Sequence, residues 1–296
     1  MHSFQKNTIV SKNQKDVFLL RGFVRSGTNW LSRLVNLHPE INCQGEFHLY
    51  PFKQFQRQYK QTFNSGSCIY QNEKDAILNA EFNRFIKNII RRYCEGDKYT
   101  LVGNRTPAGL NDMWLPHAKH LVISRDGRSV VTSWFQHIMK NNILGDINRF
   151  PKLKENKRLF DKDKKHFLKN PHDLLTSEGF FKEIVKRWSD RVIADNRVAT
   201  SADNGEIGLD YHWVKYENLH MAPVQRRKEI YQYLGVDPDK ANPIDDKNMP
   251  AYNAKKANDI NNRGTISGWQ NFFTPKQDAW FAEIAGQAME IHLSKN

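Results

Sequence analysis

The segment RGFVRSGTNWLSRL (21–34) follows the apolar run VFLL and combines residue types that could bind an anion. Gly22 and Gly27 are separated by four residues, which is the G-x4-G spacing of a nucleotide-binding P-loop. Such a turn between a strand and a helix directs backbone N–H groups and the positive end of the helix dipole at one point. The Lys that follows the second Gly in P-loop NTPases is absent, which favours a single 5′-phosphate over a triphosphate. The candidate ligands are Arg25, Ser26, Gly27, Thr28 and Asn29.

A second segment, HLVISRDGRSVVTSWF (120–135), repeats this arrangement of apolar strand, short turn and helix. Arg125 is the first residue after the strand, where a kinase or ATPase would carry an acidic residue for magnesium. Ser133 lies eight positions further on, so both residues reach one anion only if the chain turns sharply between them. Asp126 and Arg128 are expected to pair with each other. We therefore predict a second anion site, formed by Arg125 and Ser133, at another strand end.

Apolar runs alternate with segments of helical periodicity along most of the chain. This alternation predicts an α/β fold with three layers, in which a central parallel sheet of the P-loop NTPase type carries helices on both faces. Ligands of such folds bind at the carboxyl ends of the strands, where both anion motifs lie. The expected elements are strands at 17–23, 99–104, 119–124 and 211–217, and helices at 28–37, 74–95, 125–139, 180–199, 223–234 and 275–293.

With 39% hydrophobic residues in 296, the chain can form one large core, and we expect a single domain over 1–296. Its formal net charge of +13 suits an anionic partner, whether nucleic acid, nucleotide, sulfated sugar or membrane surface. Residues 149–172 are strongly basic and contain Pro151 and Pro171, which indicates a lid or insertion at about 140–178. That segment is expected to be either a solvated basic surface or a flap that binds the acceptor.

The cysteines and the N-terminus favour a reducing compartment. Three cysteines, with no C-x-x-C pair, argue against a disulfide framework and against zinc. The N-terminus lacks the apolar core of a signal peptide, and no window reaches the roughly 18 apolar residues of a membrane span. We therefore expect a cytoplasmic protein that uses neither a metal nor a membrane.

Together these motifs resemble those of the sulfotransferases that use 3′-phosphoadenosine 5′-phosphosulfate (PAPS). RSGTNWL (25–31) is similar to their 5′-phosphosulfate loop, and VISRDGRSVVTS (122–133) is similar to their 3′-phosphate motif. WVKYENL (213–219) resembles the strand whose Tyr lies beside the adenine, and NRGTISGWQNFFTPKQ (262–277) resembles the C-terminal segment that approaches the 3′-phosphate. The resemblance extends from residue 17 to about residue 290.

Carried over residue by residue, the resemblance arranges side chains around one nucleotide. The loop Arg25–Asn29 would surround the 5′-phosphosulfate, and Trp30 would occupy the place of an indole that stacks on adenine. Tyr216 would lie at the adenine edge, and ordinary core packing is the alternative for both aromatic residues. The residues implied for the 3′-phosphate are Arg125, Ser133, Arg263 and Gly264.

The catalytic segment is most similar to that of the tyrosylprotein sulfotransferases. GNRTPAGL (103–110) lacks the His that cytosolic members carry there, whereas residues 25–47 resemble the arrangement with a catalytic Glu downstream of the first loop. The resemblance thus implies that Glu46 is the general base, and we expect its carboxylate to be buried, which would raise its pKa to suit that task. His48 is the reserve candidate. Arg105, a planar and permanently charged guanidinium, would occupy the place of the Lys that supports the transition state.

The implied reaction is in-line transfer of the sulfuryl group from PAPS to a hydroxyl or amine of an acceptor. Arg25 and Arg105 would stabilise the departing 5′-phosphate, and no metal would be required. We expect a small-molecule acceptor, and the basic 149–172 segment would tolerate an anionic or sugar-like one.

Two other functions stay open at this point. A P-loop kinase or NTPase predicts a Lys after Gly27 and a requirement for magnesium. A non-catalytic protein that binds polyanions, such as nucleic acid or glycosaminoglycan, would suit the charge. No known nucleic-acid motif is evident, so we expect no nucleic-acid partner.

Overall fold

The structure is a computed structural model of the chain. It describes residues 16–46, 50–65, 71–95, 97–112, 115–141, 143–245, 247–249 and 266–295. Three of the predicted site residues, His48, Arg263 and Gly264, lie outside the described residues.

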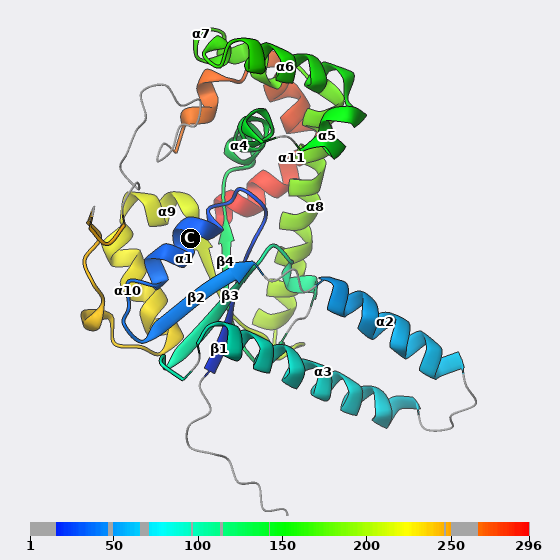
Figure 1. Cartoon of the computed structure of the whole chain (residues 1–296), viewed down its shortest axis with the longest axis vertical. Coiled ribbons are helices and arrows are strands. Elements are labelled where there is room, and N and C mark those ends of the chain that lie inside the picture. The colour runs from blue at the N-terminus through cyan, green and yellow to red at the C-terminus, as the bar shows by residue number, and fades with distance from the viewer. Residues whose placement is uncertain are drawn as a thin grey trace, which may run out of the picture.

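A sheet of five parallel strands forms the centre of the fold (Figure 1). Its spatial order is β2-β3-β1-β4-β5, so β1 lies in the middle with β4 beside it. The predicted α/β class is confirmed, and the carboxyl ends of β1 and β4, which precede the two anion motifs, are neighbours at one edge of the sheet. The strands are β1 (Asp16–Gly22), β2 (Ile41–Glu46), β3 (Leu101–Thr106), β4 (Lys119–Ser124) and β5 (Asp210–Lys215).

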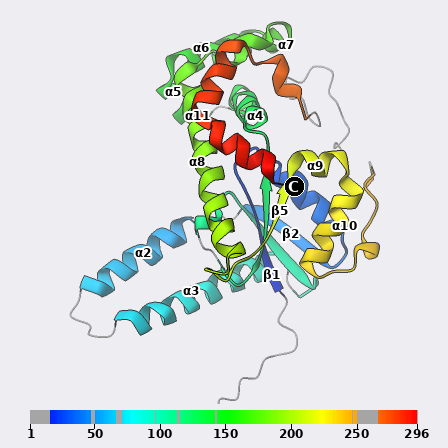
Figure 2. The same cartoon turned by 180° about the vertical axis from the view of Figure 1, so that it is seen from behind.

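Helices cover both faces of the sheet (Figures 1 and 2). One face carries α1 (Thr28–Val35), α9 (Tyr216–Met221) and α10 (Pro223–Leu234), and the other carries α3 (Gln71–Tyr93) and α8 (Glu178–Asp203). The side chains of β1 alternate between the faces: Phe18 and Leu20 pack with α1 and α10, whereas Leu19 packs with α3. Arg21 continues this alternation and therefore points to the face of α3 and α8.

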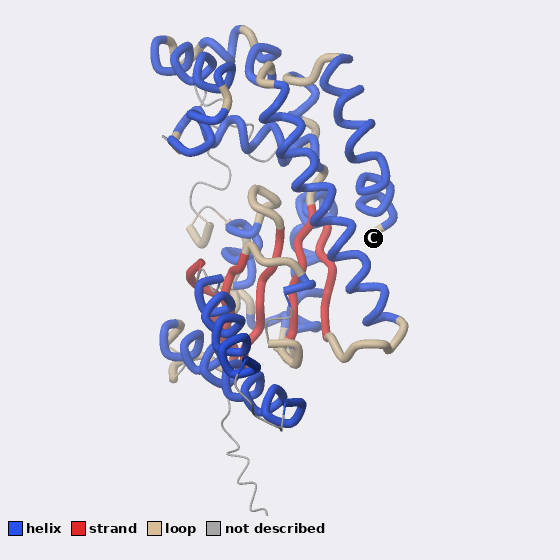
Figure 3. The backbone as a smooth tube through the Cα atoms, turned by 90° about the vertical axis from the view of Figure 1, so that its right-hand side faces the viewer, coloured by secondary structure: helices blue, strands red, loops and turns tan. Residues whose placement is uncertain are grey.

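A helical region lies beyond the carboxyl edge of the sheet (Figure 3). One apolar cluster joins its helices, with Phe135, Trp188 and Phe281 among its buried members. The helices of this region are α4 (Gly127–Lys140), α5 (Leu144–Arg149), α6 (Pro151–Lys162), α7 (His166–Lys169), the 3-10 turns η2 (Pro171–Leu175) and η4 (Gly268–Asn271), α11 (Pro275–Ser294) and the start of α8.

The basic segment predicted as a lid or insertion forms part of this region. It folds into α5, α6, α7 and η2 between α4 and α8. Its apolar residues Leu153, Phe160 and Phe167 are buried in the same cluster, because the basic residues alternate with apolar ones at helical spacing. The segment is therefore packed onto the fold, and its role as an acceptor flap stays a prediction.

The helices α2 (Tyr50–Ser65) and α3 lie side by side and extend away from the sheet (Figure 1). Gln56 Nε2 of α2 donates to Asn79 Oδ1 of α3 at 2.9 Å. The remaining elements are two short 3-10 turns, η1 (Leu110–Asp112) after β3 and η3 (Pro238–Lys240) after α10. Among the described residues, no helix combines the length and the apolar character that crossing a membrane requires.

Candidate active site

The loop between β1 and α1 is shaped by its two glycines. Gly22 lies against β4, where a Cβ would fall 2.6 Å from Ile123 Cγ2 and 2.9 Å from the Ile123 carbonyl oxygen. Gly27 has a φ of 100°, and a Cβ on it would fall 2.5 Å from a ring carbon of Tyr216. The G-x4-G spacing therefore reflects close packing at the first glycine and a left-handed backbone at the second.

The loop contains hydrogen-bond donors that could bind a ligand. Gly27 is the N-cap of α1 and has no side chain with which to cap it, and the Trp30 N–H already donates to the Gly27 carbonyl oxygen at 3.0 Å. The first-turn N–H groups that a ligand could use are therefore those of Thr28 and Asn29. Ser26 is fully buried, and its hydroxyl has no hydrogen-bond partner among the described residues. Buried polar groups in folded proteins are normally hydrogen-bonded, so this hydroxyl fits an anion bound in the loop.

Arg25 connects the loop to α4. Its φ is 72°, a left-handed value that is uncommon for a residue with a side chain. Its Nε donates to Ser133 Oγ at 3.2 Å. Ser133 was predicted to serve the second anion site, so the two predicted sites adjoin each other.

Arg125 meets the same loop from the end of β4. Its Nη1 donates to the carbonyl oxygen of Arg25 at 3.4 Å, and its guanidinium carbon lies 4.4 Å from the centroid of the Tyr216 ring. The Arg125 Nε has no hydrogen-bond partner within the described part of the chain. The fold thus brings Arg25, Arg125 and Ser133 together, although 108 positions separate Arg25 from Ser133.

Partly buried ionic contacts hold the first turn of α4. Asp126 pairs with Arg128 at 2.6 Å, as expected from the sequence. The Asp126 N–H donates to Glu217 Oε1 at 2.9 Å, and Glu217 Oε2 lies 3.4 Å from His292 Nε2 of α11. Burial would raise the pKa of Glu217, but the His292 side chain and the Asp126 N–H outweigh it and hold that pKa below its usual value. Glu217, which the sequence analysis did not single out, therefore fixes the turn that presents Arg125.

The chain that follows the predicted Arg263 and Gly264 reaches the same turn. Ser129 Oγ in the first turns of α4 donates to the carbonyl oxygen of Ile266 at 3.2 Å. Arg263 and Gly264 themselves lie outside the described residues, so their contact with a 3′-phosphate stays a prediction.

Glu46 and Arg105 lie opposite each other at the ends of β2 and β3. Gly45, with a φ of 74°, forms a bulge at which the register shifts: Gln44 pairs with Asn104, and Glu46 pairs with Arg105. Because a bulge inserts one residue, it changes the face on which the following side chain lies. Arg105 Nε donates to the Gly45 carbonyl oxygen at 3.1 Å. The bulge thus places the predicted base beside the predicted cation.

The expected burial of the Glu46 carboxylate is wrong, because this side chain is exposed. β2 is an edge strand, and Glu46 is its last residue, so β3 adjoins it on one side only. His48, the reserve base, lies outside the described residues, and its role stays a prediction.

The aromatic residues predicted around adenine form a cluster below the loop. The ring centroid of Trp30 lies 5.2 Å from that of Tyr216 and 5.6 Å from that of His220. Tyr216 is 8% exposed and joins the apolar core, and burial raises the pKa of its phenol. Tyr216 is therefore packed in the core, while Trp30 is half-buried at the rim of the same cluster. Contact of either ring with adenine stays a prediction.

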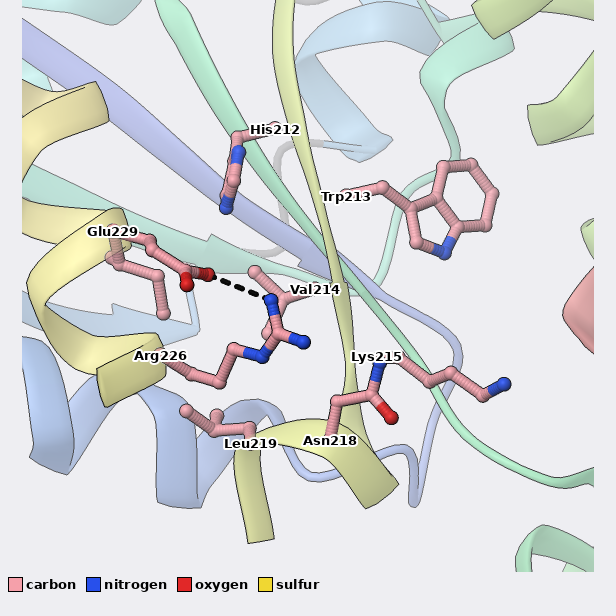
Figure 4. A pocket seen from close by; sticks show the side chains of 9 residues that line it. His212, Trp213, Val214, Lys215, Asn218, Leu219, Arg226 and Glu229 are labelled. Carbon is pink, nitrogen blue, oxygen red and sulfur yellow. Dashed lines mark hydrogen bonds and ion pairs between the residues drawn. The ribbon is translucent and has the colours of Figure 1, made fainter. Parts of the chain in front are cut away.

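A pocket lies beside β5, where β5 faces α9 and α10 (Figure 4). It contains the ion pair between Arg226 and Glu229, at 2.9 Å, and none of its lining residues belongs to the predicted site. Within the described part of the chain, no group of three or more His, Cys, Asp and Glu side chains is placed to hold a metal ion. The residues that line the pocket are His212, Trp213, Val214, Lys215, Asn218, Leu219, Arg226, Glu229 and Ile230.

Known proteins resemble this chain in sequence. A family model described as "Sulfotransferase domain" matches residues 14–292. Protein-tyrosine sulfotransferase A of Caenorhabditis elegans is 28% identical over 149 residues, which cover 47% of this chain and 38% of that protein. A Caenorhabditis briggsae relative, also named for protein-tyrosine sulfotransferase activity, is 27% identical over 128 residues, covering 42% of this chain and 44% of its own. The match spans less than half the length of both relatives.

Solved structures resemble the chain over most of its length. The sulfotransferase domain from the curacin biosynthetic pathway covers 93% of this chain and 98% of its own, with a TM-score of 0.51 and 14% identity. Mouse sulfotransferase SULT7A1, solved in complex with PAP, covers 93% of this chain and 84% of its own, with a TM-score of 0.49 and 18% identity. The first of these likenesses shows a shared fold.

Proposed function

The chain belongs to the sulfotransferase domain family, and on this premise we propose that it transfers the sulfuryl group of PAPS to a hydroxyl or amine of an acceptor. The observation that carries the proposal is the convergence of Arg25, Arg125 and Ser133 at the carboxyl ends of β1 and β4. Two cations that follow neighbouring strand ends, together with a hydroxyl of α4, suit a nucleotide with two separate anionic groups.

The described residues supply donors for both ends of that nucleotide. The N–H groups of Thr28 and Asn29 and the buried Ser26 hydroxyl would bind the 5′-phosphosulfate. Arg125 and Ser133 would bind the 3′-phosphate. Arg25 can exchange its bond with the neutral Ser133 hydroxyl for one with a phosphate oxygen, because charge-assisted hydrogen bonds to phosphate are roughly twice as strong as neutral ones.

The proposed reaction is a displacement at sulfur. The acceptor oxygen or nitrogen forms a bond to sulfur, the bond from sulfur to the bridging oxygen of the 5′-phosphate breaks, and the electron pair leaves with that oxygen. Glu46 takes the acceptor proton, and its exposure makes it accessible to an acceptor that arrives from solvent. Arg25 and Arg105 stabilise the negative charge that develops on the leaving oxygen.

The acceptor that we propose is a small molecule, and the proposed site of action is the cytoplasm. The charge of the α5–α7 segment supports an anionic or sugar-like acceptor. A tyrosine in a peptide is the second acceptor class, because the names of both relatives describe protein-tyrosine sulfotransferases.

The test is transfer from radiolabelled PAPS to a panel of phenols, steroid alcohols, sugars and tyrosine peptides, with a chelator present. We expect label in at least one acceptor and stoichiometric release of 3′-phosphoadenosine 5′-phosphate (PAP). Magnesium-dependent ATP hydrolysis without sulfuryl transfer would instead indicate an NTPase. Steeply salt-dependent polyanion binding without a saturable PAP site would indicate a polyanion-binding protein.

A further inference from the structure

A buried arginine lies just before the phosphate loop. Arg21 is the penultimate residue of β1 and is 1% exposed. Its Nε donates to His120 Nδ1 of β4 at 2.9 Å, and its Nη1 donates to the carbonyl oxygen of Gly109. Gly109 belongs to the β3–β4 connection, residues 107–118, of which 113 and 114 lie outside the described residues. Burial lowers the pKa of Arg21 to about 10, which leaves it cationic at neutral pH.

A counter-charge for this arginine comes from α8. Asp195 is 5% exposed, and its Oδ1 accepts a hydrogen bond from the Leu110 N–H at 2.7 Å. Arg191 Nη1 lies 4.0 Å from Asp195 Oδ2, and Arg191 Nη2 donates to the carbonyl oxygen of Pro107 at 2.6 Å. A Cβ on Gly109 would fall 2.6 Å from Asp195 Oδ1 and 2.7 Å from Arg191 Nη1. The charged side chains of Asp195 and Arg191 thus pack closely against the β3–β4 connection at Gly109.

Two further contacts hold the same connection. His120 Nδ1 accepts from Arg21, so the imidazole proton lies on Nε2, which donates to the carbonyl oxygen of Leu115 at 3.1 Å. Lys53 of α2 donates to Asp112 Oδ1 at 2.6 Å and to the Asp112 carbonyl oxygen at 3.0 Å. Side chains from β1, β4, α2 and α8 therefore converge on this one stretch of chain.

We propose that Arg21 and Asp195 are positioning residues that clamp the β3–β4 connection and thereby fix Arg105 relative to the phosphate loop. Arg105 is the penultimate residue of β3, two positions before Pro107, so a shift of the connection moves it. β1 carries Arg21 and is followed by the loop that contains Arg25, so the position of this one strand affects both the clamped connection and the phosphate loop. This inference rests on the proposed function, in which Arg105 acts on the leaving group.

The composition of the clamp argues for a role beyond stability. Val17 and Leu19, which share a face of β1 with Arg21, are apolar and buried, so an apolar residue would continue the pattern. The ion pair of this clamp is Arg191 with Asp195, at 4.0 Å. A buried ion pair is often no more stabilising than apolar residues of similar volume, and removing one partner is strongly destabilising. Such a group is useful where geometry must be unique, because a misplacement of 1 Å near a reacting centre can cost about 100-fold in rate.

The test removes the acceptor that holds the Leu110 N–H. In D195A we expect kcat for sulfuryl transfer to fall about 10- to 100-fold, while the Kd for PAP changes less than about threefold. Hydrogen exchange of the peptide that contains Leu110 should become faster. D195N keeps an oxygen acceptor at this position and should retain kcat within about tenfold of the wild type.

A matched control separates positioning from stability. Leu234, at the end of α10 and far from the carboxyl edge, is buried, and L234A should cost about 2–5 kcal/mol of stability. Its kcat per folded molecule should equal that of the wild type. Equal losses of kcat in D195A and L234A, or an unchanged kcat in D195A, would overturn the proposal.

Two complications have defined outcomes. If D195A does not fold, the same measurements are made on R21K. A kcat loss of about tenfold or more in R21K, with retained PAP affinity, supports the clamp, and an unchanged kcat overturns it. If the wild type transfers no sulfuryl group, the proposed function fails. The exchange and calorimetry measurements still apply then: lost protection at Leu110 in D195A supports the clamp, and retained protection overturns it.

Discussion

Replacing His120 by Gln should make the protein less sensitive to mild acid. Burial, with a smaller contribution from the neighbouring Arg21, lowers the pKa of His120 from 6.5 to about 3. The folded protein therefore keeps this imidazole neutral at pH values at which the unfolded chain protonates it. Because only the unfolded state takes up this proton, the unfolding free energy decreases as the pH falls from 6.5 towards 3.

The size of the effect follows from these two pKa values. At pH 5 the unfolded imidazole lies about 1.5 pH units below its pKa, while the folded imidazole is still neutral, so the cost is about 2 kcal/mol. Asp195 acts in the opposite direction, because burial raises its pKa to about 6, but it is present in both proteins and cancels in a comparison. Gln carries an acceptor oxygen and a donor NH₂ group, so it can both accept and donate as the neutral imidazole does, without titrating.

The assay is urea unfolding of the wild type and H120Q at pH 7 and at pH 5, followed by circular dichroism. Between these pH values the wild type should lose about 2 kcal/mol more unfolding free energy than H120Q. An identical pH dependence in the two proteins would refute the buried, neutral state of His120. A loss that is larger in H120Q would contradict the sign of the argument.

Two further substitutions test the site. E46Q should cut kcat by about 10²- to 10⁴-fold, because it removes the proposed general base, and it should leave the Kd for PAP unchanged. Rapid-quench kinetics measure the turnover and calorimetry measures the Kd. Undiminished turnover would exclude Glu46 as the base. G27A should lower the unfolding free energy by about 1–3 kcal/mol or more, because alanine is strained at a φ of 100° and its Cβ would lie 2.5 Å from Tyr216. Thermal unfolding measures this loss, and a Tm equal to that of the wild type would contradict the loop geometry at Gly27.

Strong local signals made part of the fold predictable. The strand at 119–124 and the helix at 223–234 agree with the observed bounds of β4 and α10, because an apolar run and a periodic pattern between turn residues leave little choice. β2 was not predicted, since INCQGE has few apolar residues and ends in an exposed bulge at the sheet edge. α2 was not predicted either, because polar residues interrupt its aromatic ones and much of it is exposed.

The candidate site, too, has features that the sequence could predict and features that it could not. Arg25 and Arg125 could be predicted because each lies within three residues of the end of an apolar strand, and strand ends meet at one edge of a parallel sheet. The bond from Arg25 to Ser133 and the contact between Glu217 and His292 could not, because they join distant parts of the chain. The exposure of Glu46 depends on the bulge and on the position of β2 in the sheet, and no local pattern encodes either.

Calorimetry with PAP and with adenosine 5′-monophosphate tests the central claim most directly. If Arg25 and Arg125 serve two anionic groups of one nucleotide, PAP should bind about tenfold more tightly or better, since a hydrogen bond to a charged group contributes about 1.5–3 kcal/mol. R125A should bring the two affinities close together. Equal affinity of the wild type for both nucleotides would contradict the account.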